Sequence, residues 1–304
     1  MKKTTSPRTQ SIRRVLWRVL WLNLLVATAK LTWGIMTGAI SMIADGMHSL
    51  MDTSSNVIGL IGTAVADRPP DTGHPYGHRK FEVIAALGIV FLLCLASYEI
   101  LSGAVARVMA GDKALVTPLS FIIMIVTMVI NASVSIYEKR RGEALHSPIL
   151  TADSLHTRSD VFASFAVLAG LVGTRLGQAW LDPAAAFVVV VLIGLAAYRI
   201  VASSLDVLAD ARVYTPEEIA TAALEVPGVI DLHHIRTRGV PDHAHLDFHL
   251  TVSPDTTTTE SHAISHRVID LIQRRFPGIR DITPHVEPPG CPSGPSYSSR
   301  QGTA

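Results

Sequence analysis

Six long apolar runs constrain this chain of 304 residues more than any other feature of its sequence. A helix that crosses the hydrocarbon core of a bilayer needs about 20 mostly apolar residues. The composition agrees, because 48% of the residues are hydrophobic and only 17% are charged, against about 25% charged in an average soluble domain. Short segments with turn or charge signals, such as residues 138–148, are predicted as the loops between runs. We predict an α-helical membrane protein with six transmembrane helices, at residues 15–33, 40–65, 82–109, 115–137, 148–174 and 181–205.

Basic residues near the ends of the runs predict the orientation of the chain. Lys and Arg concentrate in cytosolic loops of membrane proteins, and here they precede the first run and separate the second run from the third and the fourth from the fifth. We therefore expect a multi-pass protein of the cell (inner) membrane with both termini in the cytosol. A cleavable signal peptide is an alternative for the first run, because Ala27-Thr28-Ala29 resembles a cleavage site after a basic and apolar stretch.

The apolar runs end before residue 211, and a different pattern follows. Residues 244–252 alternate strictly between apolar and polar side chains, which is typical of a half-buried strand. Thr215 and Pro216 are suited to begin a helix as its cap and first residue. With further strands near 230–237 and 280–287 and a helix over 259–276, the region is predicted as a cytosolic αββαβ domain of the ferredoxin or metallochaperone type. The predicted domain limits are 1–14 for a cytosolic tail, 15–208 for the membrane domain, 209–288 for this domain and 289–304 for a disordered tail rich in Pro, Gly and Ser.

Overall charge and cysteine content exclude two classes of function. The 26 Lys and Arg nearly balance the 25 Asp and Glu, so the chain has no global basic field with which to hold nucleic acid. Its two cysteines, Cys94 and Cys291, form neither a disulfide framework nor a CxxC pair. The 13 histidines remain to be explained in a chain with few polar residues.

Two of the apolar runs carry the same polar pattern, ADxxHxxxD. It places His48 four residues before Asp52 in one run and His156 four residues before Asp160 in another. Residues four apart lie on one face of a helix, so two such helices facing each other offer two nitrogen and two oxygen ligands, a set suited to tetrahedral Zn²⁺. Acidic groups inside a membrane cost about 2.5–3.5 kcal/mol on insertion scales and usually mark ion pathways. The sequence therefore predicts an intramembrane metal site.

An Asp precedes each of these histidines by three residues. Asp45 and Asp153 share approximately the same helix faces as His48 and His156. They are predicted either to hold an imidazole N–H or to lie on the path by which metal reaches the site. A purely structural role for both carboxyl groups remains an alternative.

Further histidines cluster outside the apolar runs. Asp71, His74 and His78 lie together in the loop after the second run, where a metal site and a solvated turn are both possible interpretations. Eight of the 13 histidines lie beyond residue 210. Five potential ligands there fall on separate elements that an αββαβ fold would bring together, namely His233, His249, His262, His285 and Glu287. We predict a composite metal site in this domain.

With these motifs, the sequence resembles the cation diffusion facilitator family of divalent-metal/proton antiporters. The similarity extends from about residue 15 to residue 288 and is also carried by the string TGAIS at residue 37, the loop HPYGHRKFE at residue 74 and HVEP at residue 285. It implies a transporter and not an enzyme, a homodimer in the lipid bilayer, and a transport site, a loop site and a regulatory cytosolic site built from the residues named above. It also implies an ion pair between Lys80 and Asp210.

Two positions depart from the pattern of some relatives. His48 stands where some of them have Asp, which resembles zinc-preferring members and favours Zn²⁺ as substrate and regulator, while Fe²⁺, Co²⁺, Cd²⁺ and Mn²⁺ stay open. Glu287 stands where many relatives have Asp. The function expected is efflux of the metal in exchange for protons, which compete for the same ligands.

Two other classes of function are alternatives to transport. An intramembrane metalloprotease needs a general base beside the metal, usually in HExxH, and neither His48-Ser49 nor His156-Thr157 supplies one. A metal-responsive scaffold that does not transport is the second alternative, and some relatives that lost a ligand would suit it. All four ligand positions are filled in this chain.

Overall fold

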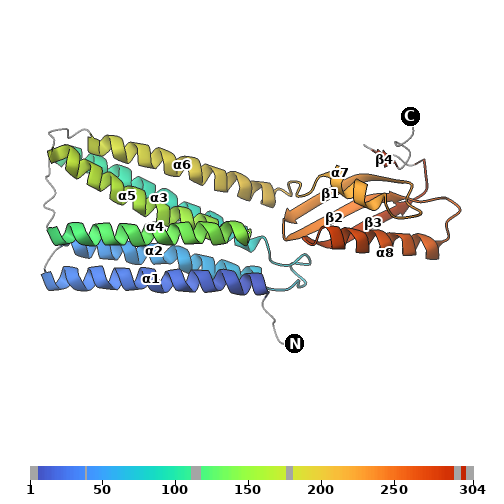
Figure 1. The fold of residues 1–304 in the computed structure, drawn as a ribbon, viewed down its shortest axis with the longest axis horizontal. Coiled ribbons are helices and arrows are strands. Elements are labelled where there is room, and N and C mark those ends of the chain that lie inside the picture. Colours follow the sequence, from blue (N-terminus) through green and yellow to red (C-terminus); the bar gives the residue numbers. More distant parts are fainter. Residues whose placement is uncertain (1–5, 38–39, 111–117, 176–180, 291–295, 299–304) are drawn as a thin grey trace. The chain divides into compact units, whose positions relative to one another are not determined.

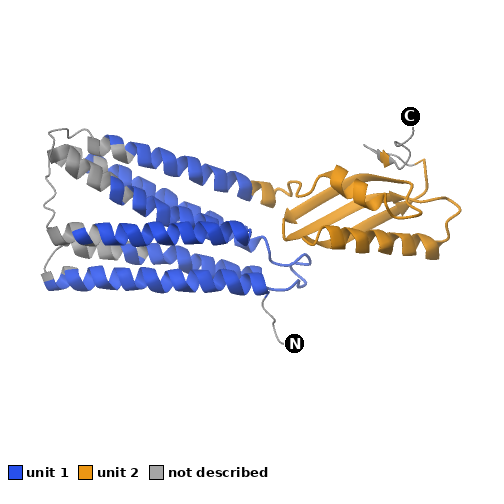
Figure 2. Cartoon of the chain, viewed as in Figure 1, with its two compact units in different colours: residues 1–204 blue, residues 205–304 orange. Residues whose placement is uncertain are grey.

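A long helical bundle makes up the first two thirds of the chain. In a computed structural model, all residues are described except 1–5, 38–39, 111–117, 176–180, 291–295 and 299–304. The chain divides into two compact units, residues 1–204 and residues 205–304 (Figure 2). Six long helices begin in the first unit, α1 (Pro7–Thr37), α2 (Ile40–Ala66), α3 (Phe81–Ala110), α4 (Pro118–Ala144), α5 (Pro148–Arg175) and α6 (Leu181–Leu208).

The six helices run up and down beside one another (Figure 1). Apolar side chains from α1 and from α3 to α6, among them Leu16, Ile89 and Ile149, form one buried cluster in the bundle. Gly62 allows α2 and α3 to approach closely, because a Cβ at this position would overlap the Cβ of Ala85. Each helix thus contributes an apolar stripe to a shared interior, as packed helices require.

The positions of the helices agree with the predicted runs, but the helices are longer. The largest difference is in α1, which begins at Pro7 instead of residue 15, and α4 continues to Ala144 through residues that the sequence predicted as a loop from residue 138. Within the described residues, three helices contain stretches long and apolar enough to cross a membrane by length and composition, namely Pro7–Trp33, Phe81–Gly103 and Phe187–Leu208. Helices α2, α4 and α5 carry more polar residues, and together with α1 they line the candidate site described below.

A polar network joins α1, α3 and the turn between α4 and α5 at one end of the bundle. Both terminal nitrogens of the Arg8 guanidinium donate to the buried carboxylate of Glu82, at 2.9 and 3.3 Å. Arg8 also donates to the backbone carbonyls of Leu145 and His146, at 2.6 and 2.7 Å. The Ser147 hydroxyl donates to Glu82 at 2.7 Å. Several donors thus compensate one buried charge, and His146, which had no role predicted from sequence, contributes its carbonyl.

The second unit is a four-stranded sheet with two helices. Its elements are α7 (Pro216–Ala223), β1 (Asp231–Val240), β2 (His243–Thr251), α8 (Thr258–Arg275), β3 (Ile279–Glu287) and β4 (Ser296–Ser298), and the strand order is β3-β2-β1-β4. Strands β1 and β2 are antiparallel, whereas β2 and β3 are parallel and are connected through α8. Up to β3 this is the αββαβ order that the sequence predicted.

Local capping signals define where the two helices begin. The Glu218 carboxylate accepts hydrogen bonds from the backbone N–H and the hydroxyl of Thr215, at 3.1 and 2.6 Å. These hydrogen bonds lower the pKa of Glu218. At α8, the Thr257 side chain accepts from the backbone N–H of Glu260 at 3.2 Å. Both arrangements satisfy backbone or side-chain groups that a helix start leaves open.

The prediction of disorder after residue 288 is wrong at one place. Ser296–Ser298 form β4 and pair antiparallel with the start of β1. The Tyr297 hydroxyl donates to the Glu217 carboxylate at 2.8 Å, which ties this strand to α7. The open edge of β1 offers backbone partners that composition alone does not reveal.

The two faces of the sheet differ in polarity. Leu246, Phe248 and Leu250 of β2 are buried in an apolar core with Val268 and Ile272 of α8. The residues between them on β2 point to the opposite face, because side chains alternate along a strand. The histidines of β2 therefore lie on the face of the sheet away from α8.

Replacement of Phe248 by Ala is expected to lower the free energy of unfolding of the second unit by about 3–5 kcal/mol, since it empties a fully buried aromatic position. Amide hydrogen exchange of β2 in the intact chain measures this loss. Thr283→Ala, at an exposed position of β3, should cost less than about 1 kcal/mol. Equal loss of protection in both variants would contradict the assignment of the core to this face.

Candidate metal sites in the two units

Three potential ligands from α2 and α5 meet inside the helical bundle. One ligand atom each from Asp52, His156 and Asp160 lies within 4.8 Å of the others. The Nε2 atom of His156 lies 3.4 Å from Oδ1 of Asp52. His156 is 4% exposed and neither of its ring nitrogens has a hydrogen-bond partner within the described structure. Two carboxylates and an open imidazole are a ligand set that a divalent transition metal accepts.

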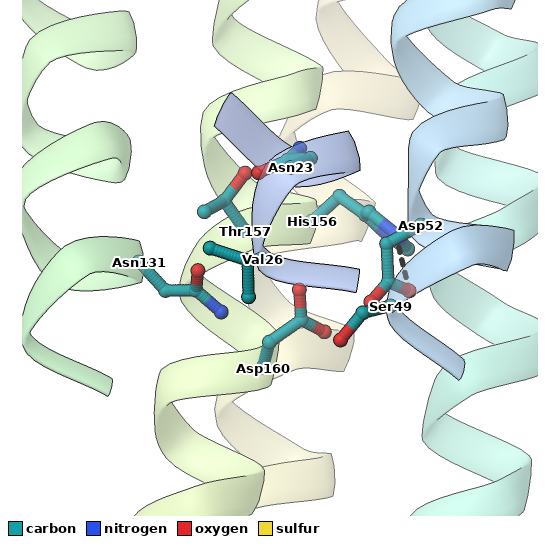
Figure 3. Close-up of a pocket in the computed structure, with 8 residues that line it drawn as sticks. All are labelled: Asn23, Val26, Ser49, Asp52, Asn131, His156, Thr157 and Asp160. Carbon is teal, nitrogen blue, oxygen red and sulfur yellow. Dashed lines mark ion pairs between the residues drawn. The ribbon is translucent and has the colours of Figure 1, made fainter. Parts of the chain in front are cut away.

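A small pocket opens beside these groups (Figure 3). Figure 3 shows the carboxyl groups of Asp52 and Asp160 and the ring of His156 directed toward the same space. Five further residues line the pocket, namely Asn23, Val26, Ser49, Asn131 and Thr157. All except Val26 carry oxygen atoms that could complete a coordination shell. The sequence patterns did not indicate these polar neighbours, because they come singly from α1, α2, α4 and α5.

The remaining predicted ligand of this site is not described. His48 and Asp45 belong to α2, but their side chains lie outside the described residues. His48 precedes Asp52 by one helical turn, so the backbone places it on the same face of α2. Its part in the site stays a prediction.

Asp153 is fully buried on α5, one turn from His156. Its Oδ1 accepts a hydrogen bond from the Ser55 hydroxyl at 2.6 Å, and its Oδ2 accepts one from the side-chain amide of Asn56 at 2.5 Å. Asn56 in turn accepts from the Asn23 amide at 3.1 Å. The hydrogen bonds of Asp153 therefore connect α5 to α2. An imidazole N–H is one partner that the sequence predicts, and the donors in the structure are Ser55 and Asn56 instead.

The loop residues between α2 and α3 also come together. Nδ1 of His74 lies 3.3 Å from Oδ1 of Asp71, and Nε2 of His78 lies 3.4 Å from Oδ2 of Asp71. Asp71 and His74 are exposed, whereas His78 is buried and packs against Phe81. The backbone N–H of His74 donates to Asp71 at 2.7 Å and holds the pKa of this carboxyl below its usual range. The loop thus presents an ionised carboxylate between two imidazoles.

The third group lies on the polar face of the sheet. The carboxylate of Glu287 at the end of β3 lies between two imidazoles, with Nε2 of His233 at 2.7 Å and Nδ1 of His249 at 3.1 Å. Nε2 of His285 is 3.9 Å from the same carboxylate, and its side chain is largely exposed. The pairing of His249 with both His233 and His285 across the sheet explains why residues far apart in sequence meet here.

Two further residues that the sequence patterns did not indicate belong to this group, namely His234 at a bulge in β1 and Asp231 at the start of the strand. The register between β1 and β2 shifts after His233, and His234 adopts a left-handed backbone with φ of 50°. An extra residue in a strand redirects the neighbouring side chains, and the ring of His234 lies 5.0 Å from that of His249. Oδ2 of Asp231 lies 3.4 Å from Nδ1 of His233 and orients this ring.

Two predictions remain untested, namely the role of His262 as a metal ligand and the ion pair between Lys80 and Asp210. His262 lies exposed on α8, with its ring 4.4 Å from that of His266, whereas the histidines of β2 occupy the other face of the sheet. Its role as a ligand stays a prediction. Lys80 and Asp210 belong to different units, so their predicted ion pair also stays a prediction.

Comparison with known proteins gives matches over most of the chain. The family model of the cation efflux transmembrane domain matches residues 16–209, and that of the cation efflux protein cytoplasmic domain matches residues 215–289. An uncharacterized transporter of Methanocaldococcus jannaschii is 34% identical over 254 residues, which cover 83% of this chain and 89% of that protein.

Two further relatives are named by what they export. A cation-efflux pump of Shewanella oneidensis is 30% identical over 80% of this chain and 82% of its own length. A manganese efflux system protein of Bacillus subtilis is 28% identical over 93% of this chain and 98% of its own length. The matches extend through both units.

Replacement of His233 by Ala is expected to weaken divalent metal binding on the sheet by about tenfold or more, because it removes the imidazole closest to Glu287. Titration calorimetry of the intact chain with Zn²⁺ measures the affinity. His266→Ala serves as the control, since it removes an exposed imidazole on the helix behind the sheet. The site assignment fails if the two variants bind Zn²⁺ equally well.

Proposed function

This chain belongs to the cation diffusion facilitator family, and from that premise we propose that it exports Zn²⁺ from the cytosol in exchange for H⁺. The coarser function follows from the family, whose members are divalent metal efflux transporters with a helical membrane domain and a cytoplasmic domain. The metal and the exchanged ion are our proposal. They rest on the chemistry of the group formed by Asp52, His156 and Asp160.

The meeting of these three side chains inside the bundle is the observation that carries the proposal. Their ligand atoms lie within 4.8 Å of one another, so a metal needs little rearrangement to bind. We propose that His48 completes a shell of two imidazoles and two carboxylates. That shell suits tetrahedral Zn²⁺ better than the oxygen-rich octahedral shells of harder cations.

Competition between metal and protons supplies the coupling. His156 binds metal only when neutral, and Asp52 and Asp160 bind it best when ionised, so protonation of the group expels the metal. Histidine changes charge near physiological pH, which allows a modest pH difference to drive the exchange. Because the ligands lie on two separate helices, a relative movement of α2 and α5 would open the site to either side of the membrane in turn.

The proposal includes a topology and an assembly. We propose six spans in the cell (inner) membrane with both termini in the cytosol, a boundary between the domains near residue 208, and a homodimer as the resemblance implies. The hydrogen bond between Asn23 of α1 and Asn56 of α2 supports α1 as a permanent span. Buried interhelical polar contacts of this kind are typical of membrane bundles.

The loop and sheet groups have separate proposed roles. We propose that Asp71, His74 and His78 bind metal at the cytosolic surface. The group at His233, His249 and Glu287 would sense cytosolic metal and stabilise the active dimer, with His285 and His262 as additional ligands. The predicted pair of Lys80 and Asp210 would then connect the two domains.

Manganese is the principal alternative substrate. One relative is named as a manganese efflux protein, and the oxygen atoms of Ser49, Asn131 and Thr157 around the pocket could enlarge the shell for a harder cation. Fe²⁺, Co²⁺ and Cd²⁺ also remain candidates. Flux measured for each metal in turn decides between them.

Replacement of Asp52 by Asn or of His156 by Ala is expected to abolish metal-driven proton movement in proteoliposomes. Either change removes one of the ligand atoms that meet in the pocket, which should lower the affinity by about tenfold or more. A pH-sensitive dye inside the vesicles reports proton flux after addition of Zn²⁺, and an indicator of free metal reports metal flux.

Asp270→Asn is the matched control for this test, because it neutralises an exposed carboxylate on α8. It should keep the flux of the parent chain. Normal transport by the Asp52 or His156 variant would refute the assigned site. Metal binding without flux in the parent chain would instead favour the non-transporting scaffold.

A further inference from the structure

A stripe of basic and aromatic side chains follows the first part of α1. Arg14, Trp17, Arg18 and Trp21 are spaced by three or four residues, so they share one face of the helix. All four residues are exposed. The rings of Trp17 and Trp21 stack with their centroids 6.5 Å apart. The stripe therefore belongs neither to the apolar core of the bundle nor to the transport site.

Helix α4, which lies beside α1, adds a second guanidinium group to this face (Figure 1). Arg18 donates to the Tyr137 hydroxyl at 3.4 Å, which connects the two helices. The central carbon of the Arg141 guanidinium lies 5.8 Å from the centroid of the same ring, and Arg141 is exposed. Two guanidinium groups from two helices thus lie at one tyrosine. The α1/α4 face is defined here as Arg14, Trp17, Arg18, Trp21, Tyr137 and Arg141.

The positive charges of this face have no acidic partner on either helix. The sequence of α1 contains neither Asp nor Glu. On α4, Glu138 is buried inside the bundle, and Glu143 lies 3.8 Å from Lys139. Among the residues that the structure describes, neither Arg18 nor Arg141 forms an ion pair. An anion from outside the chain is therefore the partner that this face can accept.

The position of Arg18 along α1 indicates that this anion is a lipid. Arg18 lies inside the run predicted to span the membrane from residue 15, and within the stretch Pro7–Trp33 that is long and apolar enough to cross one. A cation at such a position must reach the membrane interface or a negative partner. Trp and Tyr are enriched at the same interface, where their rings contact acyl chains and their polar atoms contact headgroups. The preference of basic residues for cytosolic loops accounts for Arg13 and Arg14 before the run, but it does not require an Arg inside it.

We infer that the α1/α4 face binds the headgroup of an anionic phospholipid. Phosphate oxygens accept hydrogen bonds from the guanidinium groups of Arg18 and Arg141, whose planar form suits bidentate recognition of phosphate. The acyl chains lie along Trp17 and Trp21. A headgroup held by both arginines links α1 to α4 at this end of the bundle. Its place in the cytosolic leaflet rests on the topology of the proposed function, but the binding itself does not.

Quenching of tryptophan fluorescence by brominated lipid tests the inference on the full chain. Replacement of Trp33 and Trp180 by Phe leaves Trp17 and Trp21 as the only two of the four tryptophans. The protein in a neutral detergent is titrated with phosphatidylglycerol or with phosphatidylcholine, each carrying bromine near the start of its acyl chains. Phosphatidylglycerol is expected to reach half-saturation at a concentration about fivefold lower or less, because only this lipid has a net negative charge.

Single replacements separate a site on this face from a general attraction between charges. Arg18→Gln and Arg141→Gln should each raise the half-saturating concentration of phosphatidylglycerol by about fivefold. Arg68→Gln is the matched control, because Arg68 is an exposed Arg just after α2, beside the Asp67 that accepts a hydrogen bond from Thr9 at the start of α1. It removes the same charge from the same end of the bundle and should change nothing.

A conservative variant protects the test from a trivial failure of folding. Arg18→Lys keeps the charge and loses the planar fork, so its half-saturating concentration should lie between those of the parent and Arg18→Gln. The inference is overturned if both lipids quench alike, if Arg68→Gln weakens binding as Arg18→Gln does, or if millimolar inorganic phosphate displaces the lipid. Failure of the proposed function gives a different result, since lipid binding that depends on Arg18 would persist in a chain that moves no metal.

Discussion

Compensation of buried negative charge is the interaction on which the membrane domain depends. Asp52, Asp153, Asp160 and Glu138 lie among helices that carry few cations, and an ionised carboxylate in such surroundings is stable only with donors or a positive partner. Asp153 is compensated by donors from α2. Asp52 and Asp160 share a pocket with an imidazole. In the proposed function, a transported cation would supply positive charge to Asp52 and Asp160, and protons would compete with it for the same groups.

The fold places the side chains of each group in the positions that metal binding requires. Helical spacing places His156 and Asp160 on one face of α5 and Asp52 on the facing side of α2, and the bond from Asn56 to Asp153 fixes the two helices relative to each other. In the second unit, the pairing of β2 with β1 and β3 performs the same task for His233, His249 and Glu287. The members of both groups therefore come together mainly through the regular spacing of residues in helices and strands.

Most of the fold, and most of the residues that meet in the three groups, could be predicted because their signals are local. Apolar length indicates the long helices, period-two alternation indicates β2, and the spacing of His156 and Asp160 indicates a shared helix face. The contributions of Asn131 and Ser49 could not be predicted, since each polar residue comes alone from a different helix. Glu138 was assigned to a loop because basic residues follow it, and β4 was missed because its residues carry no apolar pattern.

The coordination shell of Zn²⁺ bound to the transport site tests the central claim most directly. X-ray absorption at the zinc edge is measured on the intact chain with His74→Ala and His233→Ala, so that the loop and sheet groups are weakened. Four nitrogen and oxygen ligands at about 2.0–2.2 Å, including imidazole, are predicted. The imidazole contribution should fall when His156 is also replaced. A shell without imidazole, or one that is unchanged by loss of His156, would contradict metal binding by Asp52, His156 and Asp160.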